Sequence, residues 1–325
     1  MVPAFVAGRS VSVHRRLKTG VVGAGVFGAF HAAKHAASPR AELVGVFDID
    51  HARARALADR FNVTAYERLE DLLGATDAVT IAAPAETHFA IALEALQSGR
   101  HVYVEKPLAL SLRDADALIA LAEDRSLVLQ VGHQERFVLA AMNAPRRDAA
   151  PSKLELARCG PPSGRGEDVS VVFDLMIHDL DIARMFGFSR PRSIAACGDR
   201  NETIATLMFD GGRQCSFTAS RRHEVRRRML KATYEDGVVE IDFLNRRILD
   251  TTSSSEGASA SGLERAFDDP LCVSVDAFLS SALDGARTMV DGKAGRGALE
   301  LALLIEDARD AFNASSRAGR ERLIA

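Results

Sequence analysis

Apolar and polar positions alternate in two patterns along the first part of the chain. Short β-branched runs such as LKTGVVG and AELVGVFD are each followed by Ala-rich segments with helical spacing, VFGAFHAAKHAA and HARARALADRF. The same order recurs through DAVTIAA, ETHFAIALEALQSG, HVYVEKP, SLRDADALIALAED and LVLQVGH. Strands that alternate with helices predict an α/β fold with a parallel, doubly wound sheet. Ser111, with Asp114 three residues later, predicts where the last of these helices begins.

From about Val138 the alternation gives way to a series of short strands. SKLELARCG is followed by RSIAACG, ETIATLMFD, RQCSFTASR, RRMLKATYED and GVVEIDF, and the turns DGG and EDG predict hairpins. The Gly/Pro segment CGPPSGRGED suits a flexible cover over a cleft, and TTSSSEGASASG at 251–262 predicts a mobile loop. DPLCVSVDAFLSSALDG and GRGALELALLIEDARDAF predict amphipathic helices. We therefore expect two domains, residues 1–137 and 138–325, with 1–16 as a loose leader.

Composition narrows the function classes without selecting one. The chain has 325 residues, 47% hydrophobic and 26% charged, with a formal net charge of −3, which offers no electrostatic case for a nucleic-acid or membrane partner. Four widely spaced cysteines form no CxxC pair, so they indicate reduced thiols rather than disulfides or a zinc site. No apolar run reaches membrane-spanning length, and the N-terminus lacks the order of a signal peptide. A cytoplasmic protein is the expectation.

The first strand–helix turn carries Gly23, Gly25 and Gly28 in the spacing GxGxxG. The first glycine permits a tight turn, the second lets a pyrophosphate approach the backbone, and the third lets helix and strand pack closely. Val26 and Phe27 lie at the start of the helix, whose free N–H groups suit phosphate binding. These five residues are therefore candidates for dinucleotide binding.

The next strand ends in an acidic residue, Asp48, twenty residues after Gly28. A carboxylate at this position accepts hydrogen bonds from the ribose hydroxyls and repels a 2′-phosphate. The sequence therefore predicts NAD as the cofactor rather than NADP. Arg53 and Arg55 on the following helix are the features that argue for NADP.

The stretch DLMIHDLD at 174–181 places Asp174, His178 and Asp181 within an apolar run. Positions i, i+4 and i+7 fall on one face of an α-helix, so the three polar side chains predict a single stripe. Because unpaired charge is costly to bury, the stripe must face a substrate, a metal ion or a buried polar network. A structural Asp–His pair and a metal site are the alternatives. A nearby lysine argues against a cation, so we expect no metal.

That lysine belongs to the motif Glu105-Lys106-Pro107, at the end of a predicted strand, where ligands bind in parallel sheets. In combination with GxGxxG, AAPAETH (82–88), GHQERF (132–137) and the helix with Asp and His, this motif resembles the Gfo/Idh/MocA oxidoreductases. The resemblance covers the chain from about Lys18 onward. It implies a Rossmann domain followed by an α/β domain with a large, open, mostly antiparallel sheet. The C-terminal helices are then expected to pack back toward the Rossmann domain.

The resemblance also implies roles for individual residues. Lys106 matches the lysine that contacts the reacting hydroxyl, and Asp174 and His178 match the carboxylate and imidazole of the catalytic helix. Asp181 matches a substrate-contacting or helix-supporting acid. The positions that match the cofactor-lining residues of the family are Ala83, Pro84, His88, Glu105 and Lys106.

Oxidation of a secondary alcohol requires a base for the hydroxyl proton and a C–H bond that faces the nicotinamide. His178 is the natural base because its ordinary pKa lies near physiological pH. We expect Asp174 to orient the His178 ring and Lys106 to stabilise the alkoxide or share the proton. The sequence does not decide between Lys106 and His178 as the proton acceptor.

Within the family, three segments resemble the branch that oxidises the 3-hydroxyl of UDP-N-acetylglucosamine and passes the keto product to an aminotransferase for amide-linked lipid A. These segments are GHQERF, GPPSGRGEDVSVVFDLMIHDLD and FTASR. Two departures are DVSVVF at 168–173, where many members carry GGG, and Val138-Leu139 in place of Asn-Pro. For the diphosphate of such a substrate, Arg165 and Arg221 are the predicted contacts.

Several interpretations remain open. Arg136 is either a salt-bridge residue or a substrate clamp, and His133 either caps a strand or lines the cofactor. The arginines at 221, 222 and 226–228 are typical of a solvated face, with a phosphate role open for any one of them. The six histidines expected on the surface or on helix faces are His14, His31, His35, His51, His101 and His223.

Three other functions compete with the nucleotide-sugar dehydrogenase. The first is an NAD(P)-dependent dehydrogenase of a free sugar or polyol such as an inositol. The second is a non-catalytic NAD-binding regulator, which predicts loss of the Lys, Asp or His. The third is a glycosidase that uses NAD transiently, which predicts release of a leaving group without net reduction of the cofactor. Because an exposed sheet face favours self-association, we also expect a homodimer or homotetramer.

Overall fold

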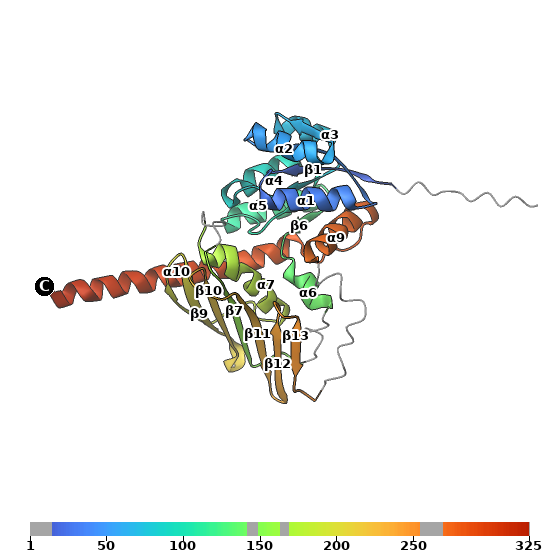
Figure 1. The fold of residues 1–325 in the computed structure, drawn as a ribbon. Coiled ribbons are helices and arrows are strands. Elements are labelled where there is room, and N and C mark those ends of the chain that lie inside the picture. The colour runs from blue at the N-terminus through green and yellow to red at the C-terminus, as the bar shows by residue number, and fades with distance from the viewer. Residues whose placement is uncertain (1–14, 142–148, 163–168, 254–268, 325) are drawn as a thin grey trace, which may run out of the picture.

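A computed structural model describes residues 15–141, 149–162, 169–253 and 269–324 of the chain. The first part is a six-stranded parallel sheet in the order β3-β2-β1-β4-β5-β6, flanked by helices (Figure 1). Its strands are β1 (Leu17–Val22), β2 (Ala41–Phe47), β3 (Thr64–Tyr66), β4 (Ala78–Ile81), β5 (His101–Val104) and β6 (Leu129–Val131). Its helices are α1 (Val26–Ala37), α2 (His51–Phe61), α3 (Leu69–Ala75), α4 (His88–Gln97), α5 (Leu112–Asp124) and α6 (Glu135–Ala141), with a 3₁₀ turn at Ala85–Thr87.

The strand order of this sheet is that of a Rossmann fold, and it confirms the predicted doubly wound sheet. Strand β4 is buried along its whole length, because helices cover both faces of the sheet. The predicted start of α5 is also correct, since the Ser111 side chain accepts a hydrogen bond from the Asp114 N–H at 3.1 Å. The pattern did not reveal the short strand β3 or the short helices α3 and α6.

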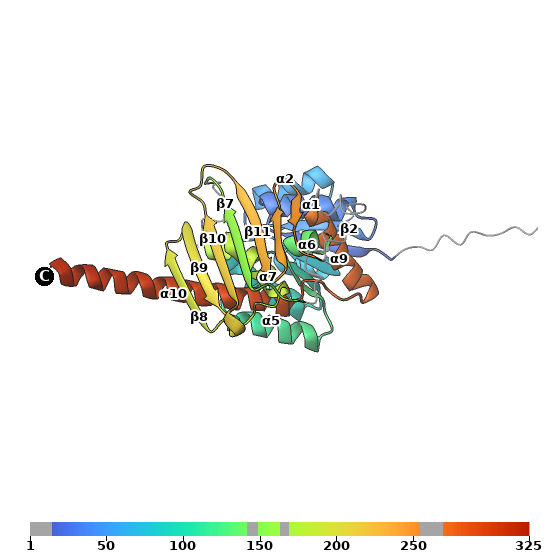
Figure 2. The same ribbon diagram turned by 90° about the horizontal axis from the view of Figure 1, so that it is seen from below.

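The second part is a seven-stranded sheet in the order β13-β12-β11-β7-β10-β9-β8 (Figure 2). Its strands are β7 (Lys153–Cys159), β8 (Ser193–Gly198), β9 (Glu202–Met208), β10 (Gln214–Ser220), β11 (Arg227–Tyr234), β12 (Gly237–Asp242) and β13 (Arg247–Asp250). β7 and β10 pair in parallel and the other neighbours are antiparallel, as the resemblance implied. Strand β13 was not predicted. The DGG segment forms a 3₁₀ turn, Asp210–Gly212, between β9 and β10.

Side chains alternate between the two faces of this sheet. Leu154 and Leu156 of β7 and Leu230 of β11 are buried on the inner face, beneath the helices, whereas Ile204 and Met208 of β9 are exposed on the outer face. The inner face is covered by a π-helical turn (Val172–Met176), α7 (Ile177–Met185) and α10 (Gly292–Ile324). These helices and the inner face of the second sheet share one hydrophobic core.

Two C-terminal helices connect the parts of the fold. Helix α9 (Pro270–Asp284) packs on α1 and α6, and its Phe278 lies against Tyr103 of β5 with ring centroids 5.7 Å apart. Helix α10 contributes Leu299 to the core of the first sheet and Ile305 to the core of the second. Figure 2 shows α10 passing the β8 edge of the second sheet and extending beyond it. None of the helices in the described part of the chain is long and apolar enough to cross a bilayer.

Two of the histidines expected on the surface or on a helix face, His31 and His35, lie on α1 and are fully buried. His31 Nε2 lies 2.8 Å from Glu105 Oε1, and His35 Nε2 lies 2.8 Å from the Thr80 hydroxyl. They lie on the side of α1 that faces the sheet, together with the buried residues Gly28 and Ala32. Burial, with a smaller effect of His31, lowers the pKa of His35 to about 3.

This buried histidine predicts an acid-sensitive stability. Between pH 6.5 and about 3 the unfolded chain protonates His35 but the folded chain does not, so folding stability falls as the pH falls. We expect the unfolding free energy of the wild type to decrease by up to about 1.4 kcal/mol per pH unit more than that of His35→Gln. Urea unfolding at pH 7, 6 and 5 measures both slopes. The exposed His51→Gln is the control, and equal slopes for wild type and His35→Gln would contradict the prediction.

Candidate active site

The glycine-rich turn between β1 and α1 leaves open space beside Gly25. A Cβ at Gly28 would lie 1.8 Å from the Gly23 carbonyl oxygen, and Gly23 has φ +96°. At Gly25, by contrast, a Cβ would meet no atom within 4 Å. Gly25 is the N-cap of α1 and no side chain caps the helix there, so its first N–H groups point toward this open space. Val26 and Phe27 are exposed at its edge.

Asp48 follows β2 and is held beside this turn. Its carboxylate accepts hydrogen bonds from the N–H groups of Ala24 at 2.6 Å and Asp50 at 2.8 Å. The two arginines that argued for NADP each pair with a carboxylate other than Asp48. Arg53 pairs with Asp50 at 2.8 Å, and Arg55 lies 3.5 Å from Glu67. The geometry at this ribose position is therefore acidic, as NAD requires.

The loops after β4 and β5 form the next wall of the site. His88 lies between them, with Nδ1 2.7 Å from the Pro107 carbonyl oxygen and Nε2 2.9 Å from that of Ala83. Glu105 is buried behind this wall, where its Oε1 accepts a hydrogen bond from Gln134 at 3.0 Å and lies 2.8 Å from His31. The cofactor-lining candidates of these two loops, Pro84 included, thus follow adjacent strands at the carboxyl edge of the sheet.

Lys106 projects from this edge to the helix that carries the polar stripe. Its Nζ donates to the Asp174 carbonyl oxygen at 2.6 Å and to Asp174 Oδ1 at 2.8 Å. The second carboxylate oxygen of Asp174 accepts a hydrogen bond from Arg221 at 3.0 Å. Burial acts to raise the pKa of Asp174, but Lys106 and Arg221 outweigh it and hold the pKa below its usual range. The lysine is therefore fixed by an ionised carboxylate.

Asp174 lies in the π-helical turn Val172–Met176 rather than in a regular α-helix. A π-turn inserts one residue into the helical repeat, and such turns are common at functional sites. The shift changes the predicted stripe, because Asp174 and His178 no longer share one α-helical face. Within the described residues, no hydrogen bond joins these two side chains. The expectation that Asp174 orients the His178 ring is therefore wrong.

His178 is partly exposed and lies against a second histidine, His133, with ring centroids 5.8 Å apart. Its Nδ1 is buried without a hydrogen-bond partner among the described residues. Burial lowers the pKa of His178 well below 6.5, and the charges of Lys106 and Arg158 act in the same direction. His178 is therefore a neutral imidazole at physiological pH.

Two buried ion-pair groups fix the helix around His178. Asp181 accepts two hydrogen bonds of 2.6 Å from Arg136, which supports the salt-bridge interpretation of Arg136 and the helix-supporting interpretation of Asp181. Arg158 pairs with Asp179 at 2.8 Å and with Glu135 at 2.9 Å. The carboxylates of the stripe therefore bind cations of the chain itself. No group of three or more potential metal ligands is present in the described ranges.

Comparison with known proteins places this geometry in a family. The family model for Gfo/Idh/MocA oxidoreductases, described as an oxidoreductase family with an NAD-binding Rossmann fold, matches residues 17–133. UDP-N-acetylglucosamine 3-dehydrogenase from Acidithiobacillus ferrooxidans is 34% identical, over 91% of this chain and 98% of its own. The chain belongs to the Gfo/Idh/MocA family. The match confirms the predicted oxidoreductase class, the Rossmann fold and NAD as the cofactor.

Solved structures agree with this assignment. The structure of the Acidithiobacillus ferrooxidans enzyme has a TM-score of 0.81 at 32% identity, over 91% of this chain and 99% of that chain. A second curated relative, the NAD⁺-dependent scyllo-inositol 2-dehydrogenase of Bacillus subtilis, is 27% identical over 86% of this chain and 90% of its own. Scyllo-inositol dehydrogenase from Lactobacillus casei, with NAD(H) and scyllo-inositol bound, has the same fold at a TM-score of 0.78 and 19% identity, over 91% of this chain and 98% of that chain.

Arg221 does not lie where the sequence predicted it. The arginine cluster was expected on a solvated face with Arg221 at a diphosphate, but Arg221 is only 7% exposed and contacts Asp174 and the Val169 carbonyl oxygen. It follows β10 on the inner face of the sheet, which the strand alternation explains. Arg165, the other predicted diphosphate contact, lies outside the described residues.

Sequence reasoning missed Arg158 and its partners Glu135 and Asp179. One signal was available, because Arg158 falls on the apolar side of the β7 alternation, in line with Leu154 and Leu156. A charged residue at such a position must be paired. Burial raises the pKa of Asp179 despite the adjacent guanidinium of Arg158, with which it forms a buried ion pair.

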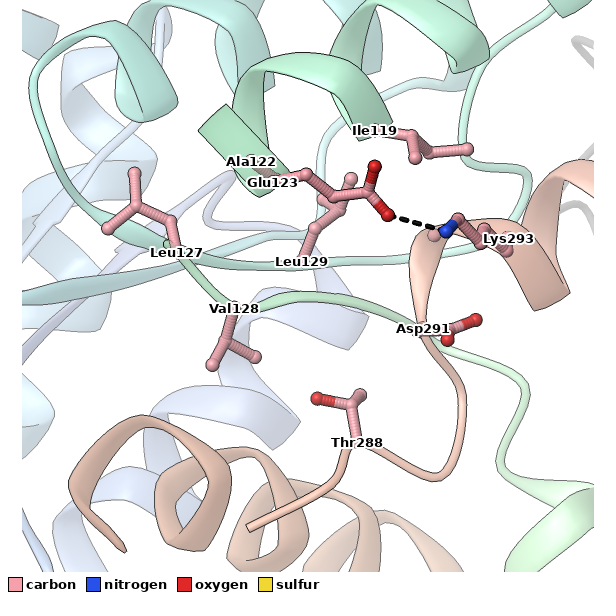
Figure 3. Close-up of a pocket in the computed structure, with 10 residues that line it drawn as sticks. Ile119, Ala122, Glu123, Leu127, Val128, Leu129, Thr288, Asp291 and Lys293 are labelled. Carbon is pink, nitrogen blue, oxygen red and sulfur yellow. Dashed lines mark ion pairs between the residues drawn. The ribbon is translucent and has the colours of Figure 1, made fainter. Parts of the chain in front are cut away.

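The pocket drawn in Figure 3 lies elsewhere in the fold. Leu127, Val128 and Leu129 line it at the amino end of β6, and an ion pair of 2.6 Å joins Glu123 to Lys293 beside it. The cofactor and substrate positions described above lie at the carboxyl ends of the strands. This pocket is therefore separate from the candidate active site.

Because Gly25 borders open space, a larger residue there should weaken cofactor binding without preventing folding. Gly25→Val should fold, since its Cβ would meet no protein atom within 4 Å, but should weaken NADH binding at least about 100-fold by occupying the pyrophosphate position. NADH fluorescence titration measures the affinity, and circular dichroism checks the fold. Gly28→Val is the matched control and should fail to fold, because its side chain overlaps the Gly23 carbonyl. Normal NADH affinity in Gly25→Val would contradict this assignment.

Proposed function

We propose that this protein is an NAD-dependent dehydrogenase of a nucleotide sugar, and that it oxidises the 3-hydroxyl of UDP-N-acetylglucosamine. The observation that carries the proposal is the position of Lys106, which follows β5 at the carboxyl edge of the Rossmann sheet and is fixed by Asp174. The near full-length relative that acts on UDP-N-acetylglucosamine supports the choice of substrate. Asp48, without a free arginine beside it, supports NAD over NADP.

In this mechanism, NAD supplies the hydride acceptor when bound. Lys106 donates a hydrogen bond to the reacting hydroxyl and stabilises the negative charge that develops on its oxygen. Asp174 and its partner Arg221 hold the ammonium group in place. His178 accepts the hydroxyl proton, because its lowered pKa keeps it neutral and able to act as a base. The substrate thereby loses one hydride and one proton and becomes a ketone.

A dehydrogenase of a free polyol is the second candidate function. It is supported by the scyllo-inositol 2-dehydrogenase relative, which is similar over most of both chains. A non-catalytic regulator is disfavoured, since Lys106, Asp174 and His178 are all present and Lys106 pairs with Asp174. We further propose that the 3-keto product is consumed by an aminotransferase, that the enzyme is cytoplasmic, and that it assembles as a homodimer or homotetramer.

A substrate panel separates the two candidate functions. The purified enzyme is incubated with NAD and either UDP-N-acetylglucosamine, N-acetylglucosamine or scyllo-inositol, with an aminotransferase and glutamate present to remove a ketone product. NADH formation and the product mass are recorded. The proposal expects turnover of UDP-N-acetylglucosamine alone. Turnover of scyllo-inositol without turnover of the nucleotide sugar would favour the second candidate.

The roles of Lys106 and His178 predict losses of rate without loss of cofactor binding. Lys106→Met should lower kcat about 10²–10³-fold, because the developing oxyanion loses its cation. His178→Asn should lower kcat about 10²–10⁴-fold, as expected for loss of a general base. Lys153→Met removes an exposed lysine on β7 and should retain wild-type kcat. Retention of more than half the activity in Lys106→Met would refute the proposed role.

The electrostatics of His178 also predict a pH profile. Because burial and neighbouring cations lower the pKa of this base, its neutral form persists as the pH falls below 6.5. The acidic limb of kcat/KM should therefore lie below pH 6.5 and should be lost in His178→Asn. Initial rates measured from pH 4.5 to 8 test this. An acidic limb centred above pH 6.5 would indicate that another group accepts the proton.

A further inference from the structure

Three arginines lie side by side at one end of the inner face of the second sheet. Arg158 of β7 is directly opposite Arg228 of β11 in the antiparallel pair, and Ala219 of β10 is the parallel neighbour of Arg158. Arg221 follows two residues after Ala219 on the same face. Like charges opposite each other in a sheet are destabilising, so this row requires anions.

The three guanidinium groups are not equally neutralised. Arg221 binds Asp174 at 3.0 Å, and Arg158 binds Asp179 at 2.8 Å and Glu135 at 2.9 Å. Arg228 contacts only Glu135 among the described residues, at 3.5 Å, and that carboxylate is already held by Arg158. Since Lys106 also pairs with Asp174, four cations of this group share three carboxylates within the described ranges of the chain. Arg228 carries the excess positive charge.

Arg228 is also the member of the row that a ligand can reach. Its side chain is 46% exposed, whereas the side chains of Arg158 and Arg221 are 5% and 7% exposed. It lies on the same side of β11 as buried Leu230, which is the side that the helices cover. Its neighbour across the sheet, Arg158, pairs with Asp179, the residue that follows His178 in the chain.

We propose that Arg228 binds the phosphate groups of the substrate and thereby makes the enzyme selective for a nucleotide sugar over a free sugar. This inference rests on the proposed function and replaces Arg221 as the predicted diphosphate contact. A guanidinium with one long ion pair retains donors that can bind phosphate oxygens in two places at once. Arg226, two residues earlier, is exposed and adds positive charge at the same end of the strand.

The proposal predicts a change in KM rather than in kcat. For wild type, Arg228→Gln and Arg228→Lys, kcat and KM are measured with UDP-N-acetylglucosamine, and the Kd of UDP is measured on the NADH-bound enzyme. Arg228→Gln should raise KM and the Kd of UDP about 10–100-fold, as for loss of a charge-assisted hydrogen bond, with kcat within about threefold. Arg228→Lys should be intermediate. Arg247→Gln, an exposed arginine on edge strand β13, should match the wild type.

Failure of this inference is distinguishable from failure of the proposed function. If the wild type turns over UDP-N-acetylglucosamine and Arg228→Gln has unchanged KM and UDP affinity, the phosphate role is wrong and the function stands. A fall in kcat with unchanged KM would show that Arg228 only supports Glu135 and His178, and would also overturn the inference. A wild type that neither binds UDP nor turns over the nucleotide sugar would overturn both.

Discussion

The ion pair between Lys106 and Asp174 joins the two halves of the molecule at the place where they work together. Lys106 follows β5 of the Rossmann sheet, and Asp174 belongs to the helical segment that covers the second sheet. The pair is largely buried, with the two side chains 15% and 19% exposed. It brings the carboxyl edge of the first sheet, where NAD binds, against the helix that presents His178.

Buried charges of this kind need a complete set of partners, because removing one partner leaves the other charge uncompensated. In the helical segment that presents His178, each of three carboxylates is paired with an arginine. Arg221 holds Asp174, Arg158 holds Asp179, and Arg136 holds Asp181. The arginines come from β7, α6 and the end of β10, so several elements of the fold fix one helix. We interpret this network as the means by which a neutral imidazole and an ammonium group are kept in fixed positions beside the substrate.

Local patterns predicted much of this architecture, and contacts distant in sequence limited the rest. The glycine spacing at 23–28 and the acid at Asp48 are local features of one βαβ unit, so the sequence alone predicted the dinucleotide site and the preference for NAD. The partners of Asp174 could not, because Lys106 and Arg221 are 68 and 47 residues away in the sequence. The π-turn was also unforeseen, since the i, i+4 spacing was read as regular α-helix. Short elements such as β13, with four residues, carry too few positions for a periodicity to appear.

We propose that this site removes the hydrogen from carbon 3 of a nucleotide sugar. The most direct test uses UDP-N-acetylglucosamine with deuterium at carbon 3, incubated with the enzyme and NAD, with the aminotransferase reaction pulling the equilibrium. Mass spectrometry then follows the label. The account predicts that deuterium appears in the reduced cofactor and is lost from the sugar. Reduced cofactor without deuterium, or a sugar that retains its label with no cofactor reduced, would contradict it.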